Sequence, residues 1–87
     1  MTTGQPLTDL EKRILDFGGK TWRHDGNRDM AIREDFGLSA TRYYQLLHGL
    51  LDRPEALAYA PATVKRHQRL RAQRQRERSL ASVAKAR

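Results

Sequence analysis

The chain has 87 residues, no cysteine and a formal net charge of +7 at pH 7. A chain of this length can form one small domain, and the absence of cysteine excludes disulfide bonds and thiolate metal sites. No apolar run reaches the roughly 18 residues that a membrane-spanning helix needs. The first residues do not have the basic-then-apolar order of a signal peptide, so we expect a soluble, cytoplasmic protein. Residues 65–79 offer only Leu70 and Ala72 as apolar side chains, too few for the apolar face of a membrane-surface helix, so we expect no membrane partner.

The first helix is predicted to begin near Thr8, after a disordered segment of residues 1–6. Thr8 and Glu11 form the S/T-x-x-E pattern of a capping box. The glycines at 18 and 19 favour the end of this helix, and we expect Trp22 to pack against the core. The residues at helical spacing predict one buried face for this helix; they are Leu7, Leu10, Ile14 and Phe17.

A second helix is predicted over residues 28–36. The preceding sequence, His24-Asp25-Gly26-Asn27, is typical of a turn, and Asn27 can cap the helix. Gly37 follows the helix at the position that favours a positive φ angle. Leu38 is predicted to be buried.

A third helix is predicted from Ser39, its N-cap, to about Leu51. Apolar residues at i, i+3, i+4 and i+7 predict a buried stripe, made of Tyr43, Leu46, Leu47 and Leu50. Together with the second helix and the turn at Gly37, this order is the helix-turn-helix pattern, whose second helix reads DNA bases in the major groove. Arg can pair with guanine, Gln with adenine, and Thr can contact thymine. The predicted DNA contacts from this helix are Ser39, Thr41, Arg42, Tyr44, Gln45 and His48.

An alternative for residues 28–51 is a generic helical hairpin with a polar exposed face. Arg33 stands four residues before Gly37, where most helix-turn-helix units have a small residue. Either the two helices cross more openly than usual, or this arginine bends outward.

The C-terminal part of the chain is strongly basic. Pro54 predicts a short fourth helix, and Pro61 predicts a long fifth one. From residue 65 onward there are nine cationic residues and one acidic residue, whereas residues 1–64 carry eight positive and nine negative charges. Residues 71–79 contain Ala72 as their single apolar side chain, so this stretch is a solvated helix, a coil or a segment ordered by its partner.

Such a basic segment can serve solubility alone, but this charge density favours a polyanionic partner. Arginine is the better fork for phosphate, and each neutralised phosphate gives a salt-dependent affinity that is independent of base sequence. The predicted domain boundaries are residues 7–60 for the helix-turn-helix domain and 61–87 for the basic segment, with Lys85 and Arg87 near its end. The predicted DNA contacts from this segment are Lys65, Arg66, Arg69, Arg71, Arg74, Arg76 and Arg78.

Other chemistry has little support in the sequence. His24, His48 and His67 are far apart, so we predict no metal site and no cofactor. No nucleophile-elbow, phosphate-loop or paired-carboxylate motif is present, so we predict neither an enzyme nor a small-molecule substrate.

The sequence resembles a family of small basic actinobacterial proteins, long described as of unknown function, that includes a nucleoid-associated DNA-binding protein of mycobacteria. The residues that carry the resemblance are LTDLEKRILDF at 7–17, AIREDFGLSATRYYQLLHGLLDRPEALA at 31–58 and the Arg-rich helix that follows. The similarity spans residues 7–78. It implies a cytoplasmic DNA-binding protein, nucleoid-associated or regulatory, with the helix-turn-helix around Ser39–Gln45 and the basic arm in contact with DNA. Gly18-Gly19 and Thr21-Trp22 depart from the family pattern, which has an acidic residue and often paired aromatics in this region.

We therefore expect an all-α protein: a helix-turn-helix core of three helices, a short fourth helix and a long basic C-terminal helix. The expected function is non-enzymatic binding of double-stranded DNA, in a nucleoid-associated or transcription-regulating role. Two alternatives stay open: an RNA- or ribosome-associated basic protein, and an adaptor that binds RNA polymerase or a sigma factor. A homodimer is also compatible with the sequence, because a two-fold pair would double the groove contacts.

Overall fold

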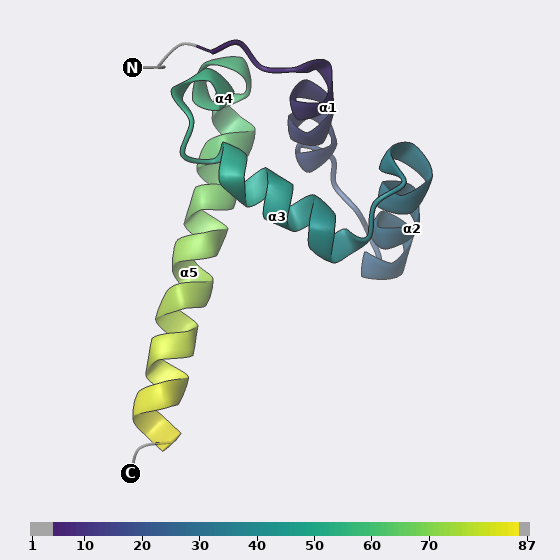
Figure 1. The fold of residues 1–87 in the computed structure, drawn as a ribbon. Coiled ribbons are helices and arrows are strands. Elements are labelled where there is room, and N and C mark those ends of the chain that lie inside the picture. Colours follow the sequence, from purple (N-terminus) through teal and green to yellow (C-terminus); the bar gives the residue numbers. More distant parts are fainter. Residues whose placement is uncertain (1–4, 86–87) are drawn as a thin grey trace.

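The structure is a computed structural model that describes residues 5–85, with side chains described as far as residue 81. This range contains five helices and no strand, which confirms the expected all-α fold (Figure 1). The expected disorder of residues 1–4 and the contributions of the Lys85 side chain and of Arg87 lie outside the described part of the chain. The helices are α1 (Asp9–Gly18), α2 (Asp25–Phe36), α3 (Ala40–Leu50), α4 (Pro54–Tyr59) and α5 (Pro61–Lys85).

Helix α1 begins at the predicted capping box. The Thr8 hydroxyl accepts from the Glu11 backbone N–H at 3.1 Å, and the Glu11 carboxylate accepts from the Thr8 N–H at 2.8 Å. The helix ends at Gly18, as the paired glycines predicted. The prediction for Leu10 was wrong, because its side chain is 44% exposed. Leu10 lines a surface groove together with Gly49, which has no side chain to cover it.

Helix α2 begins three residues earlier than predicted. Its N-cap is His24, which makes no side-chain capping bond, and Asn27 lies inside the first turn. The Arg28 N–H already donates to the His24 carbonyl at 3.3 Å, and the Arg28 guanidinium pairs with Asp25 at 3.4 Å. An acidic residue in the first turn also interacts favourably with the helix dipole. These contacts stabilise the extra turn without an asparagine cap.

The turn between α2 and α3 contains three residues, as predicted. Gly37 has a φ angle of 67°, and its N–H donates to the Arg33 carbonyl at 2.9 Å. Ser39 caps α3, because its hydroxyl accepts from the Arg42 N–H at 3.1 Å. Leu38 is only partly buried, whereas we expected a buried residue. Arg33 is exposed, so this arginine does bend outward from the helix crossing.

An aromatic cluster around Phe17 forms the centre of the core. The ring centroid of Phe17 lies 5.4 Å from Trp22, 5.6 Å from Phe36 and 5.3 Å from Tyr43. Trp22 is thus packed, as expected. Of the predicted α3 stripe, Leu46 is only partly buried. The fully buried residues are Ile14, Leu15, Phe17, Ile32, Tyr43, Leu47, Leu50, Leu51, Ala56 and Val64.

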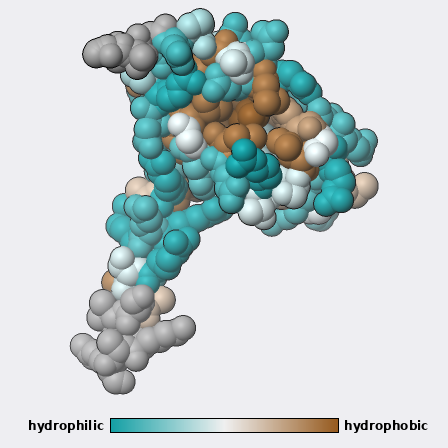
Figure 2. All heavy atoms as spheres, in the orientation of Figure 1, coloured by the Kyte–Doolittle hydropathy of each residue, from teal (hydrophilic) through white to brown (hydrophobic). Residues whose placement is uncertain are grey.

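Helix α5 starts in the core and then leaves it. Val64 is fully buried, whereas Leu70 is 42% exposed and residues 73–81 are exposed. The Gln68 amide donates to the Leu51 carbonyl at 2.7 Å and ties the base of α5 to the end of α3. Figure 2 shows hydrophobic residues gathered on one face of the helical body and mostly hydrophilic residues along α5. Of the three alternatives for residues 71–79, the structure has the solvated helix.

Candidate nucleic-acid interface

A groove between α3 and α5 brings together cations that are far apart in the sequence. Its volume is about 500 Å³, and its walls come from one face of α5, the C-terminal half of α3 and the start of α2. We call it the arginine groove. Among the described side chains that line it, none is acidic. The charged and aromatic residues of its lining are Arg28, Tyr44, His48, Arg66, His67, Arg71, Arg74 and Arg78.

Helical periodicity explains which residues of the basic segment reach the groove. Residues spaced three and four apart lie on one face of a helix. Of the seven predicted contacts on α5, three follow this spacing and line the groove, namely Arg71, Arg74 and Arg78. Arg66, five residues before Arg71, also lines it. The other three lie on other faces of α5, outside the groove, with exposed side chains; they are Lys65, Arg69 and Arg76.

The predicted contacts on α3 also divide into two sets. Thr41, Arg42 and Gln45 are exposed, and the Arg42 guanidinium donates to the Gln45 side-chain oxygen at 3.3 Å. Ser39 is exposed too, but its hydroxyl is used as the helix cap. The open face of α3 therefore carries a guanidinium, an amide and a hydroxyl side by side.

Tyr44 and His48 form the second set and face α5. The Tyr44 ring meets Tyr43 edge-on at 5.0 Å, and the Arg28 guanidinium lies over the same ring at 5.4 Å. Burial raises the pKa of the Tyr44 hydroxyl, although the nearby Arg28 charge opposes the rise. Tyr44 thus lies between the core and the groove.

The pKa of His48 depends on the positive charge of the arginine groove. Burial lowers its pKa, and the positive charges of Arg71, Arg74 and His67 lower it further. Two of these three residues are predicted phosphate contacts. A partner that neutralised those arginines would remove part of the repulsion and raise the pKa of His48.

Sequence reasoning missed two residues of the arginine groove, Arg28 and His67. Arg28 lies in α2, which was expected to supply only the first half of the helix-turn-helix. His67 was considered only as a metal ligand. The spacing of His67 four residues before Arg71 placed it on the same face of α5 and was a signal that could have found it. Nothing in the sequence indicated that the first turn of α2 approaches Tyr44.

One ion pair and one hydrogen bond to the backbone hold two of the groove arginines in place. The Arg71 guanidinium pairs with Asp52 at 3.0 Å, and the Arg66 guanidinium donates to the Gly18 carbonyl at 2.9 Å. The ring nitrogen Nε2 of His67 lies 2.9 Å from the same carbonyl, so it is the donor in that bond. Arg74 and Arg78 lie on the exposed, outer part of α5, farther from the body.

The described part of the chain contains neither a metal-binding cluster nor a membrane-spanning helix. Among the described residues, no group of three or more His, Asp or Glu side chains could hold a metal ion. No helix there is long and apolar enough to cross a membrane.

The chain matches the model of a known protein family. A family model described as "Protein of unknown function (DUF3263)" matches residues 6–79, which extend from the segment before α1 to the exposed part of α5. No curated protein and no solved structure matches the chain. The function is therefore inferred from the geometry of the arginine groove and of α3.

Proposed function

The chain belongs to the DUF3263 family, and from this premise we propose that it is a non-enzymatic protein that binds double-stranded DNA. The proposed role is that of a nucleoid-associated protein or a transcription regulator in the cytoplasm of an actinobacterium. The observation that carries the proposal is the arginine groove, in which α5 and α3 contribute to one cationic surface.

The arginine groove is suited to the sugar–phosphate backbone. Arginine presents a planar fork that pairs with phosphate oxygens, and DNA carries one negative charge per about 1.7 Å of helix axis. Arg71, Arg74 and Arg78 follow each other along α5 at spacings of three and four residues. A row of this kind meets successive phosphates with one side of a helix, and its affinity depends on salt and little on base sequence.

The open face of α3 is suited to contacts with base edges. Thr41, Arg42 and Gln45 are exposed near the N-terminus of α3, and a three-residue turn joins α2 to α3. We interpret this pair of helices as a helix-turn-helix. The N-terminal residues of the second helix are those that enter the major groove in this motif. In the proposed complex, α5 holds the backbone while α3 contacts the adjacent groove. A homodimer would present both surfaces twice, and light scattering of the free and DNA-bound protein measures that state.

The test compares two sets of three neutralising substitutions on α5 in gel-shift titrations with duplex DNA across a salt series. The groove set is Arg71→Gln, Arg74→Gln and Arg78→Gln, and the matched control set is Lys65→Gln, Arg69→Gln and Arg76→Gln. Both sets remove three positive charges from the same helix. We expect the groove set to reduce the slope of log K against log salt by about two to three, because each lost phosphate contact contributes about 0.9. Equal effects of the two sets would contradict the proposed groove.

Further measurements test the proposed base contacts and the two alternative functions. Arg42→Ala combined with Gln45→Ala should weaken binding and leave the salt slope nearly unchanged, since these residues are proposed to contact bases. Structured RNA that outcompetes duplex DNA at physiological salt would point to an RNA-binding protein instead. Co-purification with RNA polymerase that survives nuclease treatment would point to an adaptor.

A further inference from the structure

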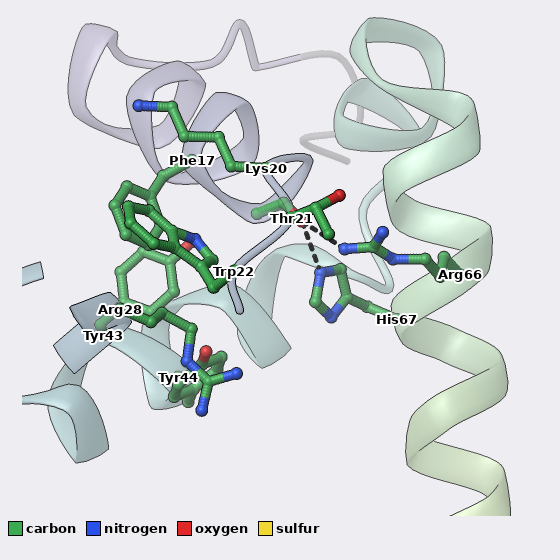
Figure 3. Close-up of a pocket in the computed structure, with 10 residues that line it drawn as sticks. Phe17, Lys20, Thr21, Trp22, Arg28, Tyr43, Tyr44, Arg66 and His67 are labelled. Carbon is green, nitrogen blue, oxygen red and sulfur yellow. Dashed lines mark hydrogen bonds between the residues drawn. The ribbon is translucent and has the colours of Figure 1, made fainter. Parts of the chain in front are cut away.

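A small cavity at the inner end of the arginine groove is lined by residues that carry buried hydrogen-bond donors without an acceptor. Its volume is about 160 Å³, and it lies where the segment after α1 meets α2, α3 and α5 (Figure 3). We call it the donor cavity. It shares Arg28, Tyr44, Arg66 and His67 with the arginine groove, so the two are continuous.

Three N–H groups of residues that line the donor cavity are buried and unpartnered. They are the indole Nε1 of Trp22, the Nε of Arg28 and the Nε of Arg66. These are the buried side-chain N or O atoms without a hydrogen-bond partner in the described part of the chain. A buried donor without an acceptor destabilises a fold, and such groups in native proteins call for an explanation such as a bound ion. All three belong to residues that line this one cavity.

Neighbouring contacts hold these three donor residues in place without satisfying the donors. Arg66 uses its Nη2 to donate to the Gly18 carbonyl, beside His67, and its Nε is left over. Arg28 pairs with Asp25 through Nη2, while its Nε is 3.9 Å from the nearest Asp29 oxygen, too far for a hydrogen bond. Trp22 is fixed by its stack on Phe17 at 5.4 Å.

We propose that the donor cavity binds a phosphate group. The residues that line the cavity carry two guanidinium groups and an indole, and none of the described side chains that line it is a carboxylate. Phosphate has acceptor oxygens that point in several directions and a charge that suits two arginines. The volume is sufficient, since an apolar cavity of about 150 Å³ accommodates benzene. Water is a poorer match, because it brings donors of its own into a site that already has an excess of them.

Two kinds of ligand carry a phosphate group that fits the donor cavity. One is a backbone phosphate of a DNA strand that lies in the arginine groove, and the other is a free phosphorylated compound. The inference does not depend on the proposed function, because the three donors need an acceptor whether or not the chain binds DNA.

The single tryptophan of the chain is one of the three donors, so it reports on the cavity directly. The full chain, labelled with nitrogen-15, is titrated with inorganic phosphate at constant ionic strength balanced by chloride. We expect a saturable displacement of the one indole N–H resonance. Arg66→Lys keeps the charge but removes the Nε–H, and it should weaken phosphate about tenfold. Arg69→Lys, on an exposed position outside the cavity, should behave as the parent protein.

An indole resonance that does not move, or the same dissociation constant in both variants, would overturn the proposal. If Arg66→Lys fails to fold, Trp22→Phe replaces it. This variant keeps a ring on Phe17 and removes the indole N–H, so calorimetry should again give binding of phosphate about tenfold weaker. Unchanged affinity in Trp22→Phe would likewise contradict the proposal.

A second arm identifies the source of the phosphate group. If short duplex DNA displaces inorganic phosphate from the indole, the cavity binds the DNA backbone. If phosphate still titrates the indole in the presence of saturating duplex, the ligand is a free phosphorylated compound. If the chain binds no duplex at all, the proposed function fails while the phosphate titration still tests the cavity.

Discussion

Tyr43 connects helix α3 to helix α1. Its ring is fully buried and contacts Phe17 and Phe36, and its hydroxyl donates to the Ile14 carbonyl in α1 at 2.7 Å. Burial raises the pKa of this hydroxyl, so the group stays protonated and remains a donor at every pH at which the protein is used. The tyrosine thus combines apolar packing in α3 with a hydrogen bond to α1.

Replacing Tyr43 with phenylalanine tests the value of that bond. We expect Tyr43→Phe to lower the free energy of unfolding by about 1 kcal/mol, because the ring is kept and one buried hydrogen bond is lost. Urea denaturation measures the change. Tyr59→Phe is the matched control, since the Tyr59 hydroxyl donates to Asp16 at 3.0 Å on the surface. The control should leave the stability almost unchanged, because its hydrogen bond is exposed to solvent, and equal losses would contradict this explanation.

At the scale of the helices, the boundaries that depend on local chemistry were predictable. The capping box at Thr8, the glycine at 37, the cap at Ser39 and the proline at 54 each act within one turn of chain, and each was confirmed. The start of α2 was not predictable from its turn-like sequence, because Arg28 contacts with Asp25 and Tyr44 stabilise the extra turn. Exposure of Leu10 likewise depends on how α1 crosses α3.

Gly37 and Gly49 give a paired prediction, because Gly37 has a positive φ angle and Gly49 lies inside a helix. Gly37 has a positive φ angle, so Gly37→Ala should destabilise the protein by about 1 kcal/mol. Gly49 lies in helix α3, where an added Cβ would meet nothing within 4 Å, so Gly49→Ala should stabilise by up to about 1 kcal/mol. An added Cβ at Gly37 also meets nothing within 4 Å, so backbone strain alone separates the two. Thermal unfolding measures both changes, and a shift of the same sign would contradict this account.

At the scale of the whole molecule, the arginine groove is a product of packing. Periodicity along α5 gave the cationic face, and periodicity along α3 separated Tyr43 from Tyr44. The approach of Arg28 and Trp22 to that face follows from how α2 and the segment before it fold back on the core, which no local pattern encodes. The sequence therefore indicated the kind of surface and most of its residues, but not the cavity at its inner end.

The charge of the groove predicts a pH dependence of DNA binding. Burial and the nearby arginines lower the pKa of His48 below its usual value of 6.5 in the free protein. DNA phosphates would raise it again, so the complex should take up protons and affinity should rise as the pH falls below about 6.5. Binding assays with His48→Gln should show a weaker pH dependence, whereas His24→Gln, at an exposed position outside the groove, should retain it. The same pH profile in His48→Gln as in the parent would refute the prediction.

The same residue affects the stability of the free protein in the opposite sense. The pKa of His48 is lower in the folded chain than in the unfolded chain, so the unfolded chain binds more protons below pH 6.5. Folding stability should therefore fall as the pH drops below 6.5, and His48→Gln should reduce that loss in denaturation experiments across this range.

The length of the outer part of α5 can be compared with a length of duplex DNA. From residue 73 the helix continues to Lys85 with side chains that are exposed as far as they are described. Thirteen helical residues extend about 20 Å, which corresponds to about six base pairs of duplex. Laid along the backbone, this extension would occupy DNA beyond the helical body itself. Neighbouring molecules would then be kept apart by the length of one helix, so the size of the footprint on DNA would scale with the number of turns in α5.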